Sequence, residues 1–264
     1  MRVIIAAIHG ILTSETDPSW PDRFSEWMYE RDREVHVTTR HYFAGPFPRW
    51  NCWVKDPWLA RGLANELELF LRGQGSSFSP PVWLVAHSNG AVIALLVTKR
   101  LIARGYQIGG LILTGAACEA DVARSGVLGW RAPAGPGARP ALGAAIAYSS
   151  EDDAVVAGDA RAPANWLHKI RDWLWGKLMW PYGCLGRTGW LEAGKPFSQP
   201  PGVYTRWYQG GHGCYFAPEN IEATFEQIYQ DIQEVETSAT AFDSQPSTVS
   251  GPRPATINLH PFIA

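Results

Sequence analysis

About a third of the way along this chain, polar residues interrupt an apolar segment in its middle. Residues 81–97 read PVWLVAHSNGAVIALLV, with His87, Ser88, Asn89 and Gly90 inside the run. A polar group in such a run costs roughly 1–3 kcal/mol of stability unless it is hydrogen-bonded. Either the chain tolerates a polar turn at this point, or the turn is the reason for the segment.

The two flanks of this turn favour different secondary structures. Val82–Ala86 is a continuous apolar run, which is typical of a strand buried on both faces of a parallel sheet. Ala91–Arg104 is predicted to be a helix and is closed by Gly105. The segment is therefore predicted to be a strand, a sharp turn and a helix, with Ser88 at the carboxyl end of the strand.

Runs of this kind recur along the chain and alternate with segments of helical periodicity. Further strands are predicted at Val3–Ile8, Glu34–Thr39, Leu111–Thr114, Ala144–Tyr148 and Val203–Tyr208. Further helices are predicted at about 17–29, 56–72 and 218–235, and a long loop at Gly126–Pro140. This alternation predicts an α/β fold with a mostly parallel central sheet of about six strands and helices on both faces.

The domain organisation follows from length and local composition. A chain of 264 residues fits one large domain, which we expect to span 1–236. A Trp-rich insertion at about 160–195 is interpreted as a cap, although its tryptophans fit core packing as well as the wall of a substrate pocket. Residues 237–264 are rich in Ser, Thr, Pro and Ala and predict a disordered tail, whose apolar stretch 257–263 could dock on the body.

Composition excludes several classes of function. The net charge of -2 indicates no nucleic-acid partner, and no apolar run reaches the 18 residues expected of a transmembrane helix. The opening MRVIIAAIHG does not resemble a signal peptide, so we expect a cytoplasmic protein. The four cysteines, Cys52, Cys118, Cys184 and Cys214, lack metal-ligand spacing and are expected to be reduced thiols. No metal and no cofactor are predicted.

The turn itself has the pattern of a nucleophile elbow. Ser88 lies between the small residues Ala86 and Gly90, close to the pattern G-x-S-x-G with Ala in the first position. Such a strand–serine–helix turn exposes the hydroxyl group at the crevice formed by the carboxyl ends of the strands. The backbone N–H of Asn89 would then be aimed at a developing oxyanion, with His87 as a supporting residue.

A nucleophilic serine needs a base and an orienting carboxylate, which follow the elbow in the order serine, acid, histidine. Asp152 and Asp153 follow the strand Ala144–Tyr148, and His212 follows the strand Val203–Tyr208. Either aspartate could instead cap a turn, and His212 could be an ordinary loop histidine. The order and the strand-end positions together favour the catalytic interpretation.

The segment His9-Gly10-Ile11 ends the first predicted strand. His9 could be only a polar strand end. In the context of the elbow, Gly10 would let the backbone N–H of Ile11 turn toward Ser88 as the second oxyanion donor.

On these residues the sequence resembles the α/β-hydrolase superfamily, over residues 1 to about 235. The resemblance is carried by the segments 9–11 (HGI), 86–90 (AHSNG), 153–156 (DAVV) and 211–213 (GHG). It is closest to small bacterial lipases and esterases and to GPI-inositol-deacylase-like hydrolases. It implies a Ser–His–Asp triad that hydrolyses esters or thioesters without a cofactor. The D-x-V-V pattern of the family selects Asp153 as the acid, with Asp152 as the alternative.

The sequence thus predicts an esterase-type hydrolase for a small-molecule ester, with an apolar acyl or aryl group suggested by the aromatic insertion. A thioesterase, an amidase or a phospholipase would use the same triad. A binding module on a hydrolase fold is the alternative of another class.

Overall fold

The computed structural model describes residues 2–10, 19–41, 54–73, 80–133, 135, 138–157, 183–197 and 202–243. Its strands are β1 (Val3–Ile8), β2 (Val35–Arg40), β3 (Val82–His87), β4 (Ile108–Thr114), β5 (Leu142–Ser149), β6 (Leu191–Glu192), β7 (Lys195–Pro196) and β8 (Val203–Trp207). The helices are α1 (Trp20–Arg31), α3 (Asp56–Gly73), α4 (Gly90–Ala103), α5 (Val127–Arg131), α6 (Ala154–Ala157), α8 (Leu185–Thr188), η2 (Cys214–Phe216) and α9 (Ile221–Asp243).

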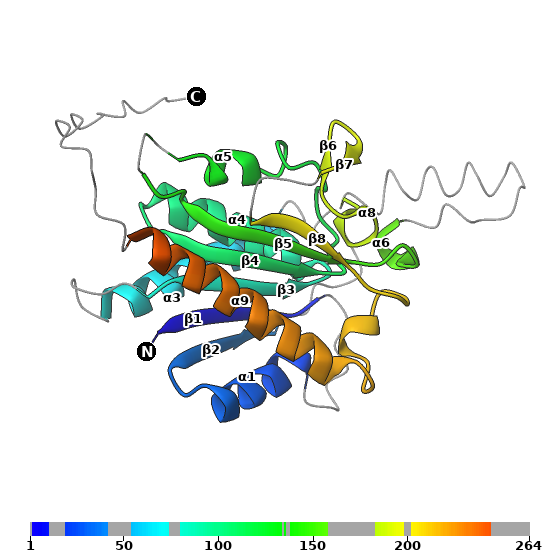
Figure 1. The fold of residues 1–264 in the computed structure, drawn as a ribbon, viewed down its shortest axis with the longest axis horizontal. Coiled ribbons are helices and arrows are strands. Elements are labelled where there is room, and N and C mark those ends of the chain that lie inside the picture. Colours follow the sequence, from blue (N-terminus) through cyan, green and yellow to red (C-terminus); the bar gives the residue numbers. More distant parts are fainter. Residues whose placement is uncertain are drawn as a thin grey trace, which may run out of the picture.

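Six of these strands form the central sheet, in the order β2-β1-β3-β4-β5-β8 (Figure 1). Every neighbouring pair is parallel, so all six carboxyl ends meet at one edge of the sheet. The inner strands are buried along their length because they consist of apolar residues on both faces, whereas β2, with its alternating sequence, lies at an edge. The predicted α/β fold with a parallel sheet of about six strands is confirmed.

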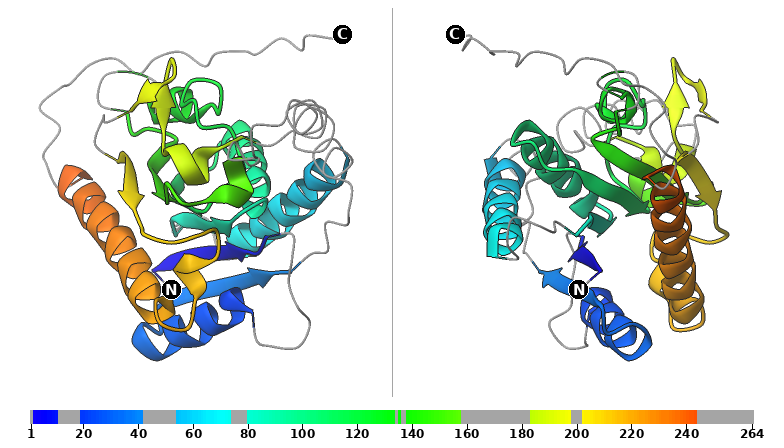
Figure 2. Two further views of the ribbon diagram at one scale, coloured as in Figure 1. Left: turned by 90° about the vertical axis from the view of Figure 1, so that its right-hand side faces the viewer. Right: turned by 60° about the vertical axis from the view of Figure 1, so that its left-hand side comes forward.

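Helices cover both faces of the sheet, as Figure 2 shows for α3 and α4 on one side and α1 and α9 on the other. Successive side chains of a strand point to opposite faces, so β1 sends Ile4, Ala6 and Ile8 into the core under α3 and α4. The alternate residues of β1 enter the second core with the apolar sides of α1 and α9. This arrangement leaves the carboxyl edge of the sheet for the loops.

The structure departs from the predicted elements most clearly in one loop and in the last helix. The short helix α5 lies within Gly126–Pro140, which its glycines and prolines had predicted to be a loop. The last helix, α9, ends at Asp243 rather than near Val235. Glu236 accepts a hydrogen bond of 2.8 Å from the indole N–H of Trp83, which ties the helix to the sheet beyond its last apolar contact.

The predicted cap lies largely outside the described residues, which resume at Gly183. The described part contains α8 and the antiparallel pair β6–β7. The tail from residue 244 onward also lies outside the described residues. No helix in the described part of the chain has the length and apolarity needed to cross a membrane. Cys118, Cys184 and Cys214 are free thiols, and Cys52 is not among the described residues.

Candidate active site

Ser88 follows β3 in a strained backbone conformation. Its φ of 55° lies in the left-handed region, which non-glycine residues rarely adopt. The strained turn is held by three backbone hydrogen bonds: Ser88 N–H donates to Thr114 O, and Ser88 O accepts from Ala91 N–H and Ala117 N–H. Such strain, at roughly 1–3 kcal/mol, persists only where the surroundings enforce it, and it concentrates at functional sites. The predicted strand–serine–helix turn is therefore present.

Two glycines allow β1 to approach this turn. A Cβ atom on Gly10 would lie 2.8 Å from the Cβ of Ser88, and one on Gly90 would lie 2.5 Å from the carbonyl oxygen of His9. Neither contact is sterically possible for another residue without a shift of the backbone. Gly10 and Gly90 thus bring the end of β1 against the turn that holds Ser88.

Asp153 and His212 meet at the same edge of the sheet. Asp153 follows β5 and is fully buried, and His212 lies in the loop after β8. The Nδ1 atom of His212 is 2.9 Å from Oδ2 of Asp153, while Oδ1 of Asp153 accepts from the Val156 N–H. The neighbouring Asp152 is exposed, so of the two candidate acids the structure pairs Asp153 with the histidine.

The loop that carries His212 is packed against the Ser88 turn. His87 donates from Nε2 to the carbonyl oxygen of His212 over 3.1 Å, and the two imidazole centroids are 4.8 Å apart. On the other side, a Cβ on Gly115 would lie 3.3 Å from Nδ1 of His212. Because Gly115 directly follows the Thr114 carbonyl that binds Ser88 N–H, both His212 and Ser88 border the end of β4.

His87 and His9 both have pKa values below the ordinary value of a histidine. Burial, with a smaller contribution from the neighbouring His212, lowers the pKa of His87 to about 3. Burial also lowers the pKa of His9, although its hydrogen bond to the Gly10 carbonyl opposes the effect. His87, which was expected to be a supporting residue, thus donates an N–H to the loop that carries His212.

Asp56 is a buried residue of the site that the sequence did not reveal. Its side chain is fully buried, and Oδ1 accepts a 3.1 Å hydrogen bond from the side-chain amide of Asn89. Burial raises the pKa of Asp56 to about 6, against the opposing effects of Asn89 and Lys55. In the sequence, Asp56 before Pro57 looks only like the start of a helix.

The predicted oxyanion donors are only partly described. Asn89 lies at the start of α4, immediately after Ser88. Ile11 lies outside the described residues. Within the described part of the chain, no three His, Cys, Asp or Glu side chains are placed to hold a metal ion.

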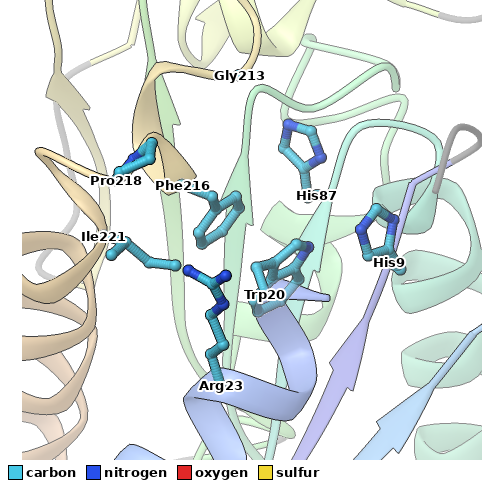
Figure 3. Close-up of a pocket in the computed structure, with 8 residues that line it drawn as sticks. All are labelled: His9, Trp20, Arg23, His87, Gly213, Phe216, Pro218 and Ile221. Atoms are coloured by element: carbon cyan, nitrogen blue, oxygen red, sulfur yellow. The ribbon is translucent and has the colours of Figure 1, made fainter. Parts of the chain in front are cut away.

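A pocket of about 280 Å³ opens beside these residues (Figure 3). Its lining residues are His9, Trp20, Arg23, His87, Gly213, Phe216, Pro218 and Ile221. His87 directly precedes Ser88, and Gly213 directly follows His212. The pocket therefore borders the chain neighbours of both predicted catalytic residues.

No protein-family profile and no curated protein sequence matches this chain. Solved structures do resemble it. Human thioesterase 2 has 12% sequence identity and a TM-score of 0.45, over 89% of this chain and 98% of that protein. Zea mays acyl-protein thioesterase 2 has 13% identity and a TM-score of 0.45, over 88% of this chain and 94% of that protein.

A Xanthomonas campestris protein described as a hydrolase of the alpha/beta superfamily has 15% identity and a TM-score of 0.40, over 90% of this chain and 99% of its own. The α/β fold class rests on the six-stranded parallel sheet and the helices on its two faces.

Proposed function

We propose that this protein is a serine hydrolase that cleaves carboxylic esters through an acyl-enzyme. The observation that carries the proposal is the hydrogen bond of 2.9 Å between buried Asp153 and His212, in a loop packed against the strained turn of Ser88. A carboxylate at Nδ1 holds the imidazole in the tautomer that leaves Nε2 free to accept a proton. Three residue types in triad order, brought to one sheet edge, support nucleophilic catalysis.

In this mechanism Ser88 Oγ attacks the acyl carbonyl while His212 takes its proton. Backbone N–H groups of Asn89 and Ile11 stabilise the oxyanion of the tetrahedral intermediate. His212 returns the proton to the departing alcohol, and water then attacks the acyl-enzyme by the same route. Asp153 orients His212 throughout. The chemistry needs no metal and no cofactor, and it applies equally to thioesters.

The test combines covalent labelling with hydrolysis of p-nitrophenyl esters of increasing acyl length. A fluorophosphonate should label Ser88, and Ser88→Ala should abolish labelling and lower turnover by about 10⁴–10⁶-fold. Asp153→Asn should lower turnover by about 10⁴-fold, because the imidazole loses its fixed tautomer. A chelator should leave activity unchanged.

The matched control is Asp152→Asn, which removes the adjacent exposed carboxylate. It should keep activity within about twofold of the wild type. Comparable losses in the two asparagine variants would contradict the assignment of Asp153, and a Ser88→Ala protein with a tenth of the activity would contradict the triad. Acyl-CoA substrates run in parallel distinguish thioesters from oxygen esters.

A further inference from the structure

Among the described residues that line the pocket beside the Ser88 turn, one is charged: Arg23 of α1, whose side chain is exposed. The other walls are apolar or neutral, since Trp20 and Phe216 stack with ring centroids 4.3 Å apart and His9 and His87 both have lowered pKa values. Figure 3 shows the guanidinium group directed toward Phe216 and Ile221, with the two histidines at the other end of the pocket.

Arg23 has no acidic partner among the described residues. The carboxylate of the adjacent Asp22 is engaged with the Ser19 hydroxyl and with His41. Glu219 and Glu222 adjoin the pocket residues Pro218 and Ile221 in the chain, but in the described structure neither forms an ion pair with Arg23. The guanidinium donors are therefore available to a ligand.

A guanidinium group beside apolar walls favours a carboxylate or phosphate, which can accept two parallel hydrogen bonds from it. The volume of about 280 Å³ lies at the small end of ligand pockets, so it suits a short chain.

We infer that this pocket binds the acyl part of a short ester that ends in an anionic group, with Arg23 as its anchor. This inference rests on the proposed function, because it places the acyl carbonyl at Ser88 and the acyl chain along the apolar wall that the stacked rings of Trp20 and Phe216 form. The sequence composition suggested a purely apolar acyl or aryl group. The pocket instead favours a short apolar chain with a terminal carboxylate or phosphate.

The experiment compares three chromogenic substrates of matched length: the p-nitrophenyl esters of hexanoic acid, of adipic acid as the hemiester, and of 5-phosphonopentanoic acid. The wild type should prefer at least one anionic ester by about tenfold or more in kcat/KM, and the preference should fall at high salt. The two anionic esters distinguish a carboxylate site from a phosphate site.

Arg23→Gln should remove this preference while changing kcat/KM for the hexanoate ester by less than about threefold. Arg33→Gln is the matched control, since Arg33 lies beyond the other end of α1 and contacts the Tyr29 ring. Its substrate preference should equal that of the wild type. Equal losses on charged and neutral esters in Arg23→Gln, or no anionic preference in the wild type, would overturn the inference.

A binding measurement separates this inference from the proposed function. Monoethyl adipate should bind Ser88→Ala protein more tightly than ethyl hexanoate does, and Arg23→Gln in that background should abolish the difference. If fluorophosphonate labelling and hydrolysis both fail, the proposed function is wrong, and calorimetry with these two esters still decides the role of Arg23. Equal affinities would overturn the anion site even if the enzyme is active.

Discussion

Asp56 connects ionisation to the turn that holds Ser88. Its Oδ1 accepts from the side chain of Asn89, the residue after Ser88, and its Oδ2 has no hydrogen-bond partner in the described structure. A buried carboxylate with one unsatisfied oxygen is costly, which is why burial raises its pKa to about 6. The residue therefore binds a proton more tightly in the folded chain than in the unfolded one.

The higher pKa of Asp56 in the folded chain determines how the free energy of unfolding changes with pH. Between pH 4 and 6 the folded state holds more protons at Asp56 than the unfolded state, so its contribution to stability falls as pH rises through that window. A shift from 3.8 to about 6 corresponds to about 3 kcal/mol lost at neutral pH. Asp56→Asn cannot ionise and keeps an oxygen for Asn89. It should raise the free energy of unfolding by up to about 3 kcal/mol at pH 8.

Urea unfolding of both proteins at pH 8 and pH 4.5 measures the effect, and the gain should fall to about 1 kcal/mol at the lower pH. Asp56→Ala provides the comparison, because it removes the acceptor as well as the charge. A gain of equal size at both pH values would show that the carboxylate is not the cause. The hydrogen bond to Asn89 is retained in Asp56→Asn, so ester hydrolysis should persist in that variant.

Among the elements, α9 makes a buried polar contact with the sheet through Asp231. Asp231 is fully buried and accepts a hydrogen bond of 2.7 Å from the Tyr148 hydroxyl of β5. It also accepts two hydrogen bonds from Arg206 of β8, through Nε at 2.8 Å and through NH2. A single side chain of α9 thus binds two neighbouring strands.

Removal of this carboxylate should cost more than removal of an exposed one on the same helix. Asp231→Ala leaves a buried hydroxyl and a half-buried guanidinium without their partner, so the free energy of unfolding should fall by about 3–5 kcal/mol. Glu226→Ala is the control, because Glu226 pairs with Arg31 at the surface, where such pairs contribute at most about 1 kcal/mol. Denaturant unfolding that gives similar losses for the two would contradict this account of α9.

Local sequence was sufficient for the elements but not for these contacts. The strands were predictable because Val3–Ile8 and Val82–Ala86 are apolar on both faces, a pattern that only a covered parallel sheet accommodates. The triad candidates were predictable because each follows a strand. The hydrogen bonds of Asp56 with Asn89 and of Asp231 with Tyr148 join residues 33 and 83 positions apart, and no spacing along the chain signals such pairs.

The hydrophobic cores on the two faces of the central sheet share the same strands, and this favours a single folded unit. Trp83 illustrates the connection. Its ring is packed so tightly against β4 that a Cβ on Gly110 would lie 2.3 Å from it, and its N–H binds Glu236 of α9. The unit that we propose therefore includes α9 to Asp243, beyond the boundary of 236 expected from sequence.

Removal of the segment that follows α9 should leave the stability of the protein unchanged. Removal of residues 244–264 deletes none of the described contacts, and the composition of that segment, with four prolines and no apolar stripe, predicts too little burial to offset its ordering entropy. The melting temperature should stay within about 2 °C of the full chain, because less than about 1 kcal/mol is lost.

Truncation after Val235 is the matched comparison. It also removes Glu236 and leaves the Trp83 N–H without its partner, so it should lower the melting temperature by several degrees. A drop of ten degrees in the protein that ends at Asp243 would show instead that the apolar stretch 257–263 docks on the body. Higher ester hydrolysis at an unchanged melting temperature would place that stretch in the substrate cleft, where its removal frees Ser88 for an ester.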